Sequence, residues 1–259
     1  VASNGMITRV PLTLICLTTF ALPSYCFQCI RLRGGSPLKG KMDHCVDGVC
    51  GRGGGSDASK VSTPKSKTSG NRVIIDVFSD PACPWCYVGK GNLDTALENL
   101  RSSGDEVADR VVVNWRSFFI DPETNPRGED YLAYNRRRWG SDGWAQSLPG
   151  RQEGLKFKNW KTWPNTLLAA RLIHLAGERG GWELRHRAKG IIFRMIYEDG
   201  LNVSEPAVVE AAGRELGLDG VGDWLRSDEG KREVLQEARE ASRAGIGGVP
   251  YFICSREGS

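Results

Sequence analysis

Two cysteines are separated by two residues in the stretch Cys83-Pro84-Trp85-Cys86, and this spacing suits redox chemistry. The same spacing also fits half of a zinc site, so its context has to decide between the two. At the start of a helix, free backbone N–H groups and the helix dipole stabilise a thiolate, which lowers a thiol pKa from about 8.5 to about 3.5–7.5. We therefore expect Cys83 to be the nucleophile and Cys86, one turn further along, to be the resolving thiol.

The surrounding residues predict that Cys83 lies at a junction between a strand and a helix. Before it, Val73–Val77 is mostly β-branched and short enough to form a buried strand. Pro84 suits the first turn of a helix, where its missing N–H would have no partner. After the pair, apolar residues recur at helical spacing: Val88, Leu93, Ala96, Leu97 and Leu100. This context favours a redox dithiol over a metal site.

A second motif lies near the end of the sequence. A glycine-rich turn that begins at Gly245 leads into Val249-Pro250 and then into an apolar run up to Ile253. A proline that opens a strand is typical of a constrained turn, and we expect the Val249–Pro250 peptide bond to be cis.

Together, the two motifs resemble those of the thioredoxin superfamily, and Phe78–Lys90 resembles the FrnE-like branch of the DsbA family. The resemblance covers roughly Val73 to Ile253. It implies an α/β fold in which a thioredoxin-like sheet is interrupted by a helical insertion. It also implies a catalytic dithiol that faces a cis-proline loop. The residues of that site are Cys83, Pro84, Trp85, Cys86, Val249 and Pro250.

The remaining pattern predicts a matching order of elements. Val111–Ile120 is rich in β-branched and aromatic residues and indicates a second strand, parallel to the first because a helix connects them. Beyond Asp121 the pattern is helical, and Ser204 is a good N-cap for one helix. The expected helices are Asn165–Ala176, Ala188–Glu198, Ser204–Gly217 and about Ser227–Ala244.

We expect one folded domain over residues 71–259, with a thioredoxin part at 71–122 and 245–259 and a helical insertion at 123–244. Only nine residues follow Pro250, whereas a thioredoxin-like sheet normally continues with a hairpin strand and a terminal helix. The sequence therefore predicts a C-terminal truncation that leaves a sheet edge uncovered. Cys254 is expected to pack in the core as a strand residue.

Pro164–Leu172 also resembles the FrnE-like pattern, in which a histidine commonly precedes the arginine. Here Ala170 precedes Arg171, so this chain lacks that histidine. His174 lies one helical turn later; it could partly substitute, but we expect a packed or exposed side chain without a catalytic role.

Residues 1–70 differ in composition from the rest of the chain. Residues 1–72 hold ten Lys or Arg and three Asp or Glu, a net charge of +7, whereas the remainder carries −3. The apolar run Val10–Leu22 is too short to span a bilayer but suits the core of a signal peptide. We expect a targeting segment and disordered linker with an organelle or secretory address, a plastid included; the alternative is a cytoplasmic protein. The excess of basic residues lies in this N-terminal leader and not in the folded part, so we expect no nucleic-acid-binding face.

The leader also contains possible zinc ligands, Cys26 and Cys29 together with His44, Cys45 and Cys50. The last two cysteines are separated by four residues, not two, and no strand or helix pattern frames either pair. We therefore expect no metal site.

Three functions compete. The first is a thiol–disulfide oxidoreductase that uses the C-P-W-C dithiol, with no cofactor beyond that dithiol, and with protein or small-molecule thiols and disulfides, glutathione included, as partners. The second is a glutathione-linked isomerase or transferase of the kappa-class type, relatives that typically carry serine where Cys83 stands. The third is a truncated, non-catalytic remnant. The intact dithiol favours the first function. We expect no nucleotide-binding motif and no stable membrane span. The sequence does not determine the oligomeric state.

Overall fold

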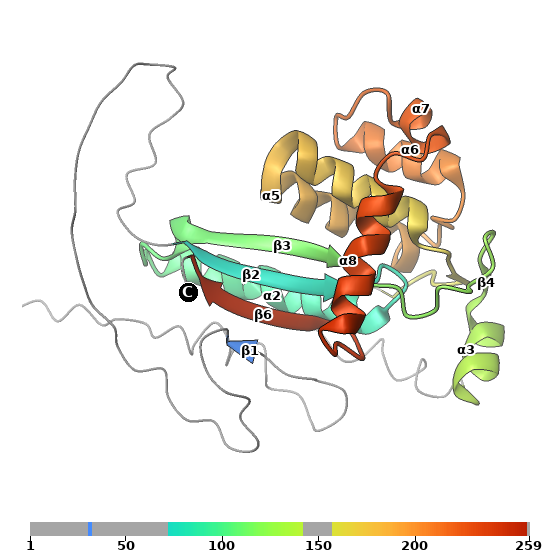
Figure 1. The fold of residues 1–259 in the computed structure, drawn as a ribbon, viewed down its shortest axis with the longest axis horizontal. Helices are drawn as coiled ribbons and strands as arrows, with labels where there is room; N and C mark the ends of the chain where they lie inside the picture. Colours follow the sequence, from blue (N-terminus) through green and yellow to red (C-terminus); the bar gives the residue numbers. More distant parts are fainter. Residues whose placement is uncertain (1–30, 33–71, 142–156, 258–259) are drawn as a thin grey trace, which may run out of the picture.

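The computed structural model describes residues 31–32, 72–141 and 157–257 (Figure 1). The targeting segment predicted over residues 1–70, with its candidate zinc ligands, lies outside the described residues apart from strand β1 (Arg31–Leu32). β1 pairs in parallel with strand β6 (Tyr251–Arg256), opposite Ile253 and Cys254.

A four-stranded sheet in the order β1-β6-β2-β3 forms the centre of the fold. Strands β2 (Val73–Ser79) and β3 (Val111–Ser117) run parallel, which confirms the predicted pairing, and β6 runs antiparallel to β2. Side chains in β2 and β3 alternate between buried and half-buried positions, as expected for strands with one face against the core. Helix α2 (Pro84–Ser102) connects β2 to β3 and begins directly after Cys83, as predicted.

The second strand is shorter than the sequence predicts. β3 ends at Ser117, three residues before the expected end at Ile120. The N–H of Ile120 donates to Oδ2 of Asp80 (2.8 Å), and the N–H of Ser117 donates to Oε2 of Glu237 (2.9 Å). Ser117 pairs with Ser79, the last residue of β2, so β3 ends where its partner strand turns away.

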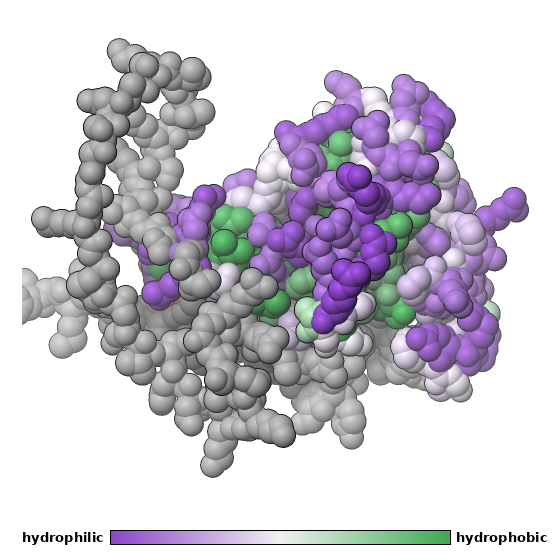
Figure 2. Space-filling model, viewed as in Figure 1, coloured by the Kyte–Doolittle hydropathy of each residue, from purple (hydrophilic) through white to green (hydrophobic). Residues whose placement is uncertain are grey.

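A mainly helical block separates β3 from β6, as predicted. Figure 1 shows α2 behind the sheet and α8 in front of it, with α5, α6 and α7 grouped beside β3. The outward surface in the region of α8 is hydrophilic (Figure 2), in keeping with a helix that buries only Val234 and Ala241. The elements of the block are β4 (Glu129–Asp130), α3 (Tyr131–Trp139), β5 (Thr162–Trp163), α5 (Leu167–Tyr197), α6 (Pro206–Glu215), α7 (Val221–Arg226) and α8 (Lys231–Arg243). A short 3-10 helix, Ala108–Arg110, precedes β3.

The two helices predicted at Asn165–Ala176 and Ala188–Glu198 are both present within the element α5. They meet at a kink where Gly180 and Gly181 leave helical geometry. Gly181 has a φ of 71° and a ψ of −164°, a conformation open to glycine but strained for a residue with a Cβ. The prediction of two helices is confirmed, but the helical residues extend closer to the break than the predicted ends at Ala176 and Ala188.

Two predicted helix starts were wrong. Ser204 does not cap α6, which begins at Pro206; its Oγ accepts the N–H of Asn165 instead (2.8 Å). The helix predicted from Ser227 begins at Lys231, after a turn. The Ser204 hydroxyl is thus engaged by a distant segment, whereas the Ser227 hydroxyl bonds locally to the Trp224 carbonyl and the Glu229 N–H.

That turn is held by Arg171, a buried arginine on α5. Its guanidinium donates to four backbone carbonyls at the end of α7 and in the turn to α8: Trp224 (2.9 Å), Leu225 (3.1 Å), Ser227 (2.7 Å) and Glu229 (2.9 Å). It also stacks over the Trp224 ring, 4.7 Å from the centroid. Carbonyls at a helix C-terminus lack partners within the helix, and a cation suits that end of the helix dipole. Arg171 therefore joins α5, α7 and α8.

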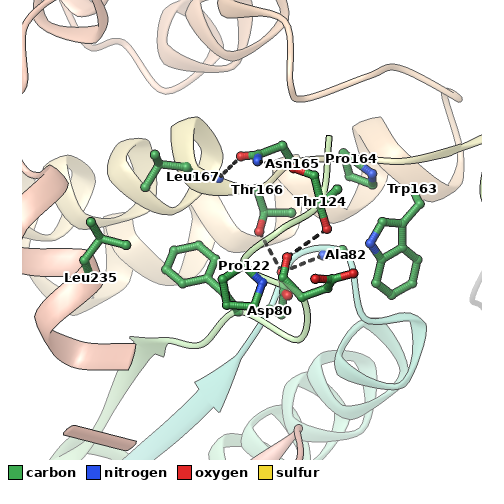
Figure 3. Close-up of a pocket in the computed structure, with 12 residues that line it drawn as sticks. Asp80, Ala82, Pro122, Thr124, Trp163, Pro164, Asn165, Thr166, Leu167 and Leu235 are labelled. Atoms are coloured by element: carbon green, nitrogen blue, oxygen red, sulfur yellow. Dashed lines mark hydrogen bonds between the residues drawn. The ribbon is translucent and has the colours of Figure 1, made fainter. Parts of the chain in front are cut away.

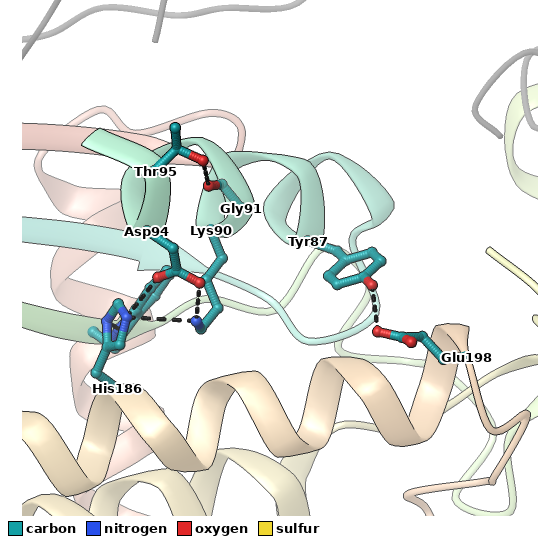
Figure 4. Close-up of polar contacts among 8 residues, drawn as sticks. Tyr87, Lys90, Gly91, Asp94, Thr95, His186 and Glu198 are labelled. Atoms are coloured by element: carbon teal, nitrogen blue, oxygen red, sulfur yellow. Dashed lines mark hydrogen bonds and ion pairs between the residues drawn. The ribbon is translucent and has the colours of Figure 1, made fainter. Parts of the chain in front are cut away.

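A polar network joins α2 to α5 (Figure 4). Asp94 accepts from Lys90 (2.6 Å) and from Nε2 of His186 (2.7 Å), and the Trp115 indole donates to Nδ1 of His186 (3.0 Å). Indole N–H is only a donor, so Nδ1 must accept and the histidine proton lies on Nε2. Nearer the start of α2, the Tyr87 hydroxyl donates to Glu198 (2.6 Å). These bonds set the position of α2 and hence of the dithiol at its start.

We expect the variant Arg171→Met to lower the free energy of unfolding by about 3 kcal/mol, because four buried carbonyls lose a charged donor. Chemical denaturation monitored by circular dichroism measures this. The matched control is Arg226→Ala, which removes an exposed arginine paired with Asp223 and should cost less than about 1 kcal/mol. Equal losses in the two variants would contradict the role given to Arg171.

Candidate active site

The two predicted redox cysteines lie together at the start of α2. Cys83 is the N-cap residue, and its N–H donates to the carbonyl of Asp80 (3.0 Å). The N–H of Cys86 donates to the carbonyl of Cys83 (3.0 Å), which closes the first turn. Both thiols are free and buried; Cys83 is 4% exposed and Cys86 is fully buried. Pro84 occupies the first turn of the helix, and Trp85 is half-buried against the core.

The loop before β6 lies against this helix start. The Val249–Pro250 peptide bond is cis, and the Cys83 thiol contacts the Val249 carbonyl oxygen (3.5 Å). Gly89 allows the close approach, since a Cβ there would lie 3.1 Å from Cγ of Pro250. All six residues that the sequence analysis assigned to the site therefore come from α2 or from this loop.

The structure reverses the expected direction of the Cys83 pKa. Burial raises the pKa of the Cys83 thiol well above its usual value, and the neighbouring Cys86 raises it further. The backbone N–H of Cys86 lowers it, as expected at a helix N-terminus, but this effect is smaller than desolvation. The sequence analysis expected a lowered pKa because it placed Cys83 at a helix start without knowing that the position is nearly closed to solvent.

Asp80 is a site residue that the sequence analysis quoted but did not assign. Its carboxylate is 3% exposed and accepts from the Ala82 N–H (3.0 Å), the Ile120 N–H (2.8 Å) and the Thr166 hydroxyl (2.8 Å). Burial raises the pKa of Asp80, while these bonds and the charge of Lys189 oppose that rise. An aspartate three residues before the nucleophile was the available signal.

Lys189 is a second residue that sequence reasoning missed. It lies on α5, is 2% exposed, and donates to the Ser79 carbonyl (3.4 Å). Its ammonium lies 4.9 Å from the centre of the Phe193 ring and 5.4 Å from that of Trp115. Burial lowers the pKa of Lys189 to about 8, against the charges of Cys86, Asp80 and Cys83, which raise it. A lysine on the apolar face of a predicted helix, three residues before Ile192, was the signal in the sequence.

Other candidates named from the sequence lie elsewhere. His174 is half-buried near Arg185, with 3.5 Å between its Nδ1 and Nη2 of that arginine, and does not line the dithiol. Cys254 lies on β6 and is half-buried. Among the described residues, no group of three or more His, Cys, Asp or Glu side chains is placed to hold a metal ion. In the same ranges no helix combines the length and apolar character that a membrane span needs.

Comparisons with known proteins agree with this geometry. The family model for the DSBA-like thioredoxin domain matches residues 74–258, so the chain belongs to that family. This supports the general class of thiol–disulfide oxidoreductases with a DsbA-like fold, a family that typically uses no cofactor.

The individual relatives include solved structures and one related sequence. The chain is 29% identical to a probable DsbA oxidoreductase from Streptomyces coelicolor, with a TM-score of 0.61 over 71% of this chain and 80% of that one. It is 26% identical over 190 residues to the uncharacterized protein YwbO of Bacillus subtilis (strain 168), which covers 70% of this chain and 86% of YwbO. A putative protein disulfide isomerase from Nitrosomonas europaea shares the fold at 17% identity, with a TM-score of 0.53 over 73% of this chain and 87% of its own.

The lowered pKa of Lys189 predicts how the stability of the protein depends on pH. Below about pH 8 the lysine is protonated in the folded and unfolded states, and folding carries the full cost of burying the charge. Between about pH 8 and 10.5 only the unfolded state keeps the proton, so this cost fades. We expect Lys189→Met to gain up to about 3 kcal/mol of stability relative to the native protein at pH 7, a gain that shrinks toward pH 10.

Urea denaturation at several pH values measures this difference. Lys231→Met, which removes an exposed lysine, is the control and should show no such dependence on pH. A stability difference for Lys189→Met that stays constant from pH 7 to pH 10 would contradict the assigned burial cost.

The raised pKa of Cys83 predicts how the rate of its alkylation depends on pH. Since only the thiolate is alkylated, labelling of Cys83 by iodoacetamide should keep accelerating above pH 9 and should not level off near neutral pH. Mass mapping of peptides after timed labelling gives the rate at each pH. A plateau reached below pH 7 would mean that the helix N-terminus outweighs desolvation.

Proposed function

We propose that this protein is a thiol–disulfide oxidoreductase in which Cys83 attacks and Cys86 resolves. One observation carries the proposal: both free thiols lie in the first turn of α2, and Cys83 contacts the carbonyl of Val249 in the loop before β6. A dithiol with this spacing can form and release its own disulfide without moving the backbone far. Membership of the DSBA-like family supports the class of reaction.

The reaction balances in two steps. The Cys83 thiolate attacks one sulfur of a substrate disulfide, and the substrate S–S bond breaks as the mixed disulfide forms. The Cys86 thiolate then attacks Cys83 Sγ and displaces the second substrate sulfur as a thiolate. The substrate gains two electrons and two protons, and the enzyme becomes the Cys83–Cys86 disulfide. The reverse sequence oxidises a substrate dithiol.

Asp80 and Lys189 supply charge and proton handling in this proposal. Both are buried beside the dithiol, where a thiolate without a countercharge would be costly. The Lys189 ammonium stabilises the negative charge that develops as each thiol is deprotonated. Its pKa of about 8 lets it lose or regain a proton near neutral pH. Lys189 is thus the group that favours ionisation of Cys83, which burial otherwise opposes.

The alternative functions named from the sequence receive less support. Glutathione-linked relatives of the kappa-class type typically carry serine at the position of Cys83, whereas this chain keeps both thiols. Glutathione remains a proposed exchange partner, together with protein disulfides. We also propose an organelle or secretory address on the basis of residues 1–70, and a single catalytic domain over residues 71–259.

The two cysteines should fail in different ways when changed to serine. Cys83→Ser should abolish disulfide reduction, because no attacking thiol remains. Cys86→Ser should attack once and accumulate as a mixed disulfide with the substrate. Turnover assays with a disulfide-bonded peptide, followed by non-reducing mass spectrometry, separate these results. Cys254→Ser, on β6, is the control and should retain activity. Full turnover by Cys83→Ser would overturn the assignment.

A further inference from the structure

Thr166 is the N-cap residue of α5, yet its hydroxyl makes no hydrogen bond that caps this helix. A threonine at this position usually accepts a backbone N–H of the first helical turn. Here the Leu167 N–H donates to the side-chain oxygen of Asn165 instead (3.2 Å). The Thr166 hydroxyl donates to Oδ1 of Asp80 (2.8 Å), 86 residues earlier in the chain (Figure 3). The start of α5 is therefore bonded directly to the turn that precedes the dithiol.

The Thr166–Asp80 pair is nearly closed to solvent. Thr166 is 4% exposed and Asp80 is 3% exposed. Both belong to the wall of a pocket beside the start of α2, together with Ala82 and Thr124 (Figure 3). Because water contributes little at such a position, the charge of Asp80 depends on the donors that the protein supplies.

Among the described residues, three groups donate to the Asp80 carboxylate, and the Thr166 hydroxyl is the one that belongs to a side chain. The others are the backbone N–H groups of Ala82 (3.0 Å) and Ile120 (2.8 Å). A backbone donor is fixed by the path of the chain and is retained when side chains are exchanged. The hydroxyl is therefore the donor that the identity of residue 166 controls.

The Thr166 hydroxyl favours the charged form of Asp80. A carboxylate only accepts hydrogen bonds, so the hydroxyl donates its single proton to it. A hydroxyl can also accept from a neutral acid, but a bond to a charged group is about twice as strong. Burial raises the pKa of Asp80, whereas the bonds from Ile120, Ala82 and Thr166 lower it, as does the charge of Lys189. Loss of the hydroxyl therefore raises this pKa further, and Asp80 takes up a proton at a higher pH.

The charge of Asp80 acts on titratable groups from several elements. These groups are Cys83 at the start of α2, Tyr134 on α3, Lys189 and Tyr197 on α5, and Asp121, which lines the same pocket after β3. Burial is the main influence on the pKa of Cys83 and on that of Lys189, and the Asp80 carboxylate raises both. A charged Asp80 therefore opposes ionisation of Cys83 and keeps Lys189 protonated, whereas a neutral Asp80 does neither.

We propose that Thr166 is a positioning residue that keeps Asp80 charged and thereby sets the reactivity of Cys83. Its hydroxyl holds the same carboxylate oxygen that accepts the Ala82 N–H, next to the nucleophile. Thr166 acts through Asp80, and its effect depends on the hydroxyl and not on the shape of the side chain. The first residue of the long helix of the insertion thus influences the chemistry at the start of α2. This inference rests on the proposed oxidoreductase function and adds a residue to it.

The test compares Thr166→Val, which removes the hydroxyl, with Thr166→Ser, which keeps it. Infrared spectroscopy of the protonated carboxyl band follows the pH at which Asp80 takes up a proton, and the variant Asp80→Asn identifies that band by its absence. We expect the midpoint to move to higher pH in Thr166→Val and to stay at its native position in Thr166→Ser.

The same variants should differ in the reactivity of Cys83. Between the native and the shifted midpoint, iodoacetamide should alkylate Cys83 of Thr166→Val about fivefold or more faster than Cys83 of the native protein, because a neutral Asp80 no longer opposes the thiolate. Above the shifted midpoint Asp80 is charged in both proteins, and the two rates should converge. Mass mapping after timed labelling gives these rates.

Thr124→Val is the matched control. Thr124 is 5% exposed and lines the same pocket, but its hydroxyl donates to the Asp121 backbone carbonyl (2.8 Å) and not to a carboxylate. This variant should leave the Asp80 midpoint and the Cys83 labelling rate unchanged, although it also loses a buried hydrogen bond and some stability. Urea denaturation measures that loss, so a merely structural role of Thr166 would appear as lower stability without a shift of the midpoint.

A native midpoint in Thr166→Val, or an equal shift in Thr166→Ser or Thr124→Val, would overturn the inference. Thr166→Ala is a second variant without the hydroxyl and should shift the midpoint in the same direction if Thr166→Val does not fold. None of these measurements needs turnover. Failure of the native protein to exchange peptide disulfides would therefore count against the proposed function, whereas an unshifted midpoint counts against the role of Thr166.

Discussion

The buried carboxylate of Asp80 is the interaction on which the geometry of the site depends. It accepts bonds from Ala82 next to the nucleophile, from Ile120 after β3, and from Thr166 at the start of α5. One side chain therefore joins the end of β2, the end of β3 and the helical block. Three donors offset much of the cost of burying a carboxylate, and they also hold the turn that presents Cys83.

The dithiol is subject to opposing electrostatic effects. Burial disfavours a thiolate at Cys83, while the free N–H groups of α2 and the ammonium of Lys189 favour one. A site of this kind favours the protonated form of the Cys83 thiol at rest. It can still stabilise negative charge when a substrate disulfide arrives, because the cation is already in place and needs no reorganisation.

Access to the dithiol is controlled by packing on two sides. On one side, Gly89 lets Pro250 approach α2 closely, so that the Val249 carbonyl touches Cys83. On the other side, the pocket shown in Figure 3 opens next to Ala82. The helical block supplies α5 and α8 to that pocket, and Arg171 holds these helices in register through the turn after α7. The insertion thus contributes the countercharge, through Lys189 on α5, and part of the packing around the dithiol.

Local patterns in the sequence were enough to predict much of this protein. Alternating burial in β2, helical spacing after Pro84 and the Val249-Pro250 turn predict the strand, the helix and the loop, because each depends on a few adjacent residues. Only the tertiary structure decided the rest. The Cys83 pKa depends on desolvation by residues distant in sequence, and Lys189 acquires its role because α5 packs against β3. The end of β3 is likewise set by where its partner strand β2 ends, and Ser204 is engaged by Asn165, 39 residues away, which no local pattern encodes.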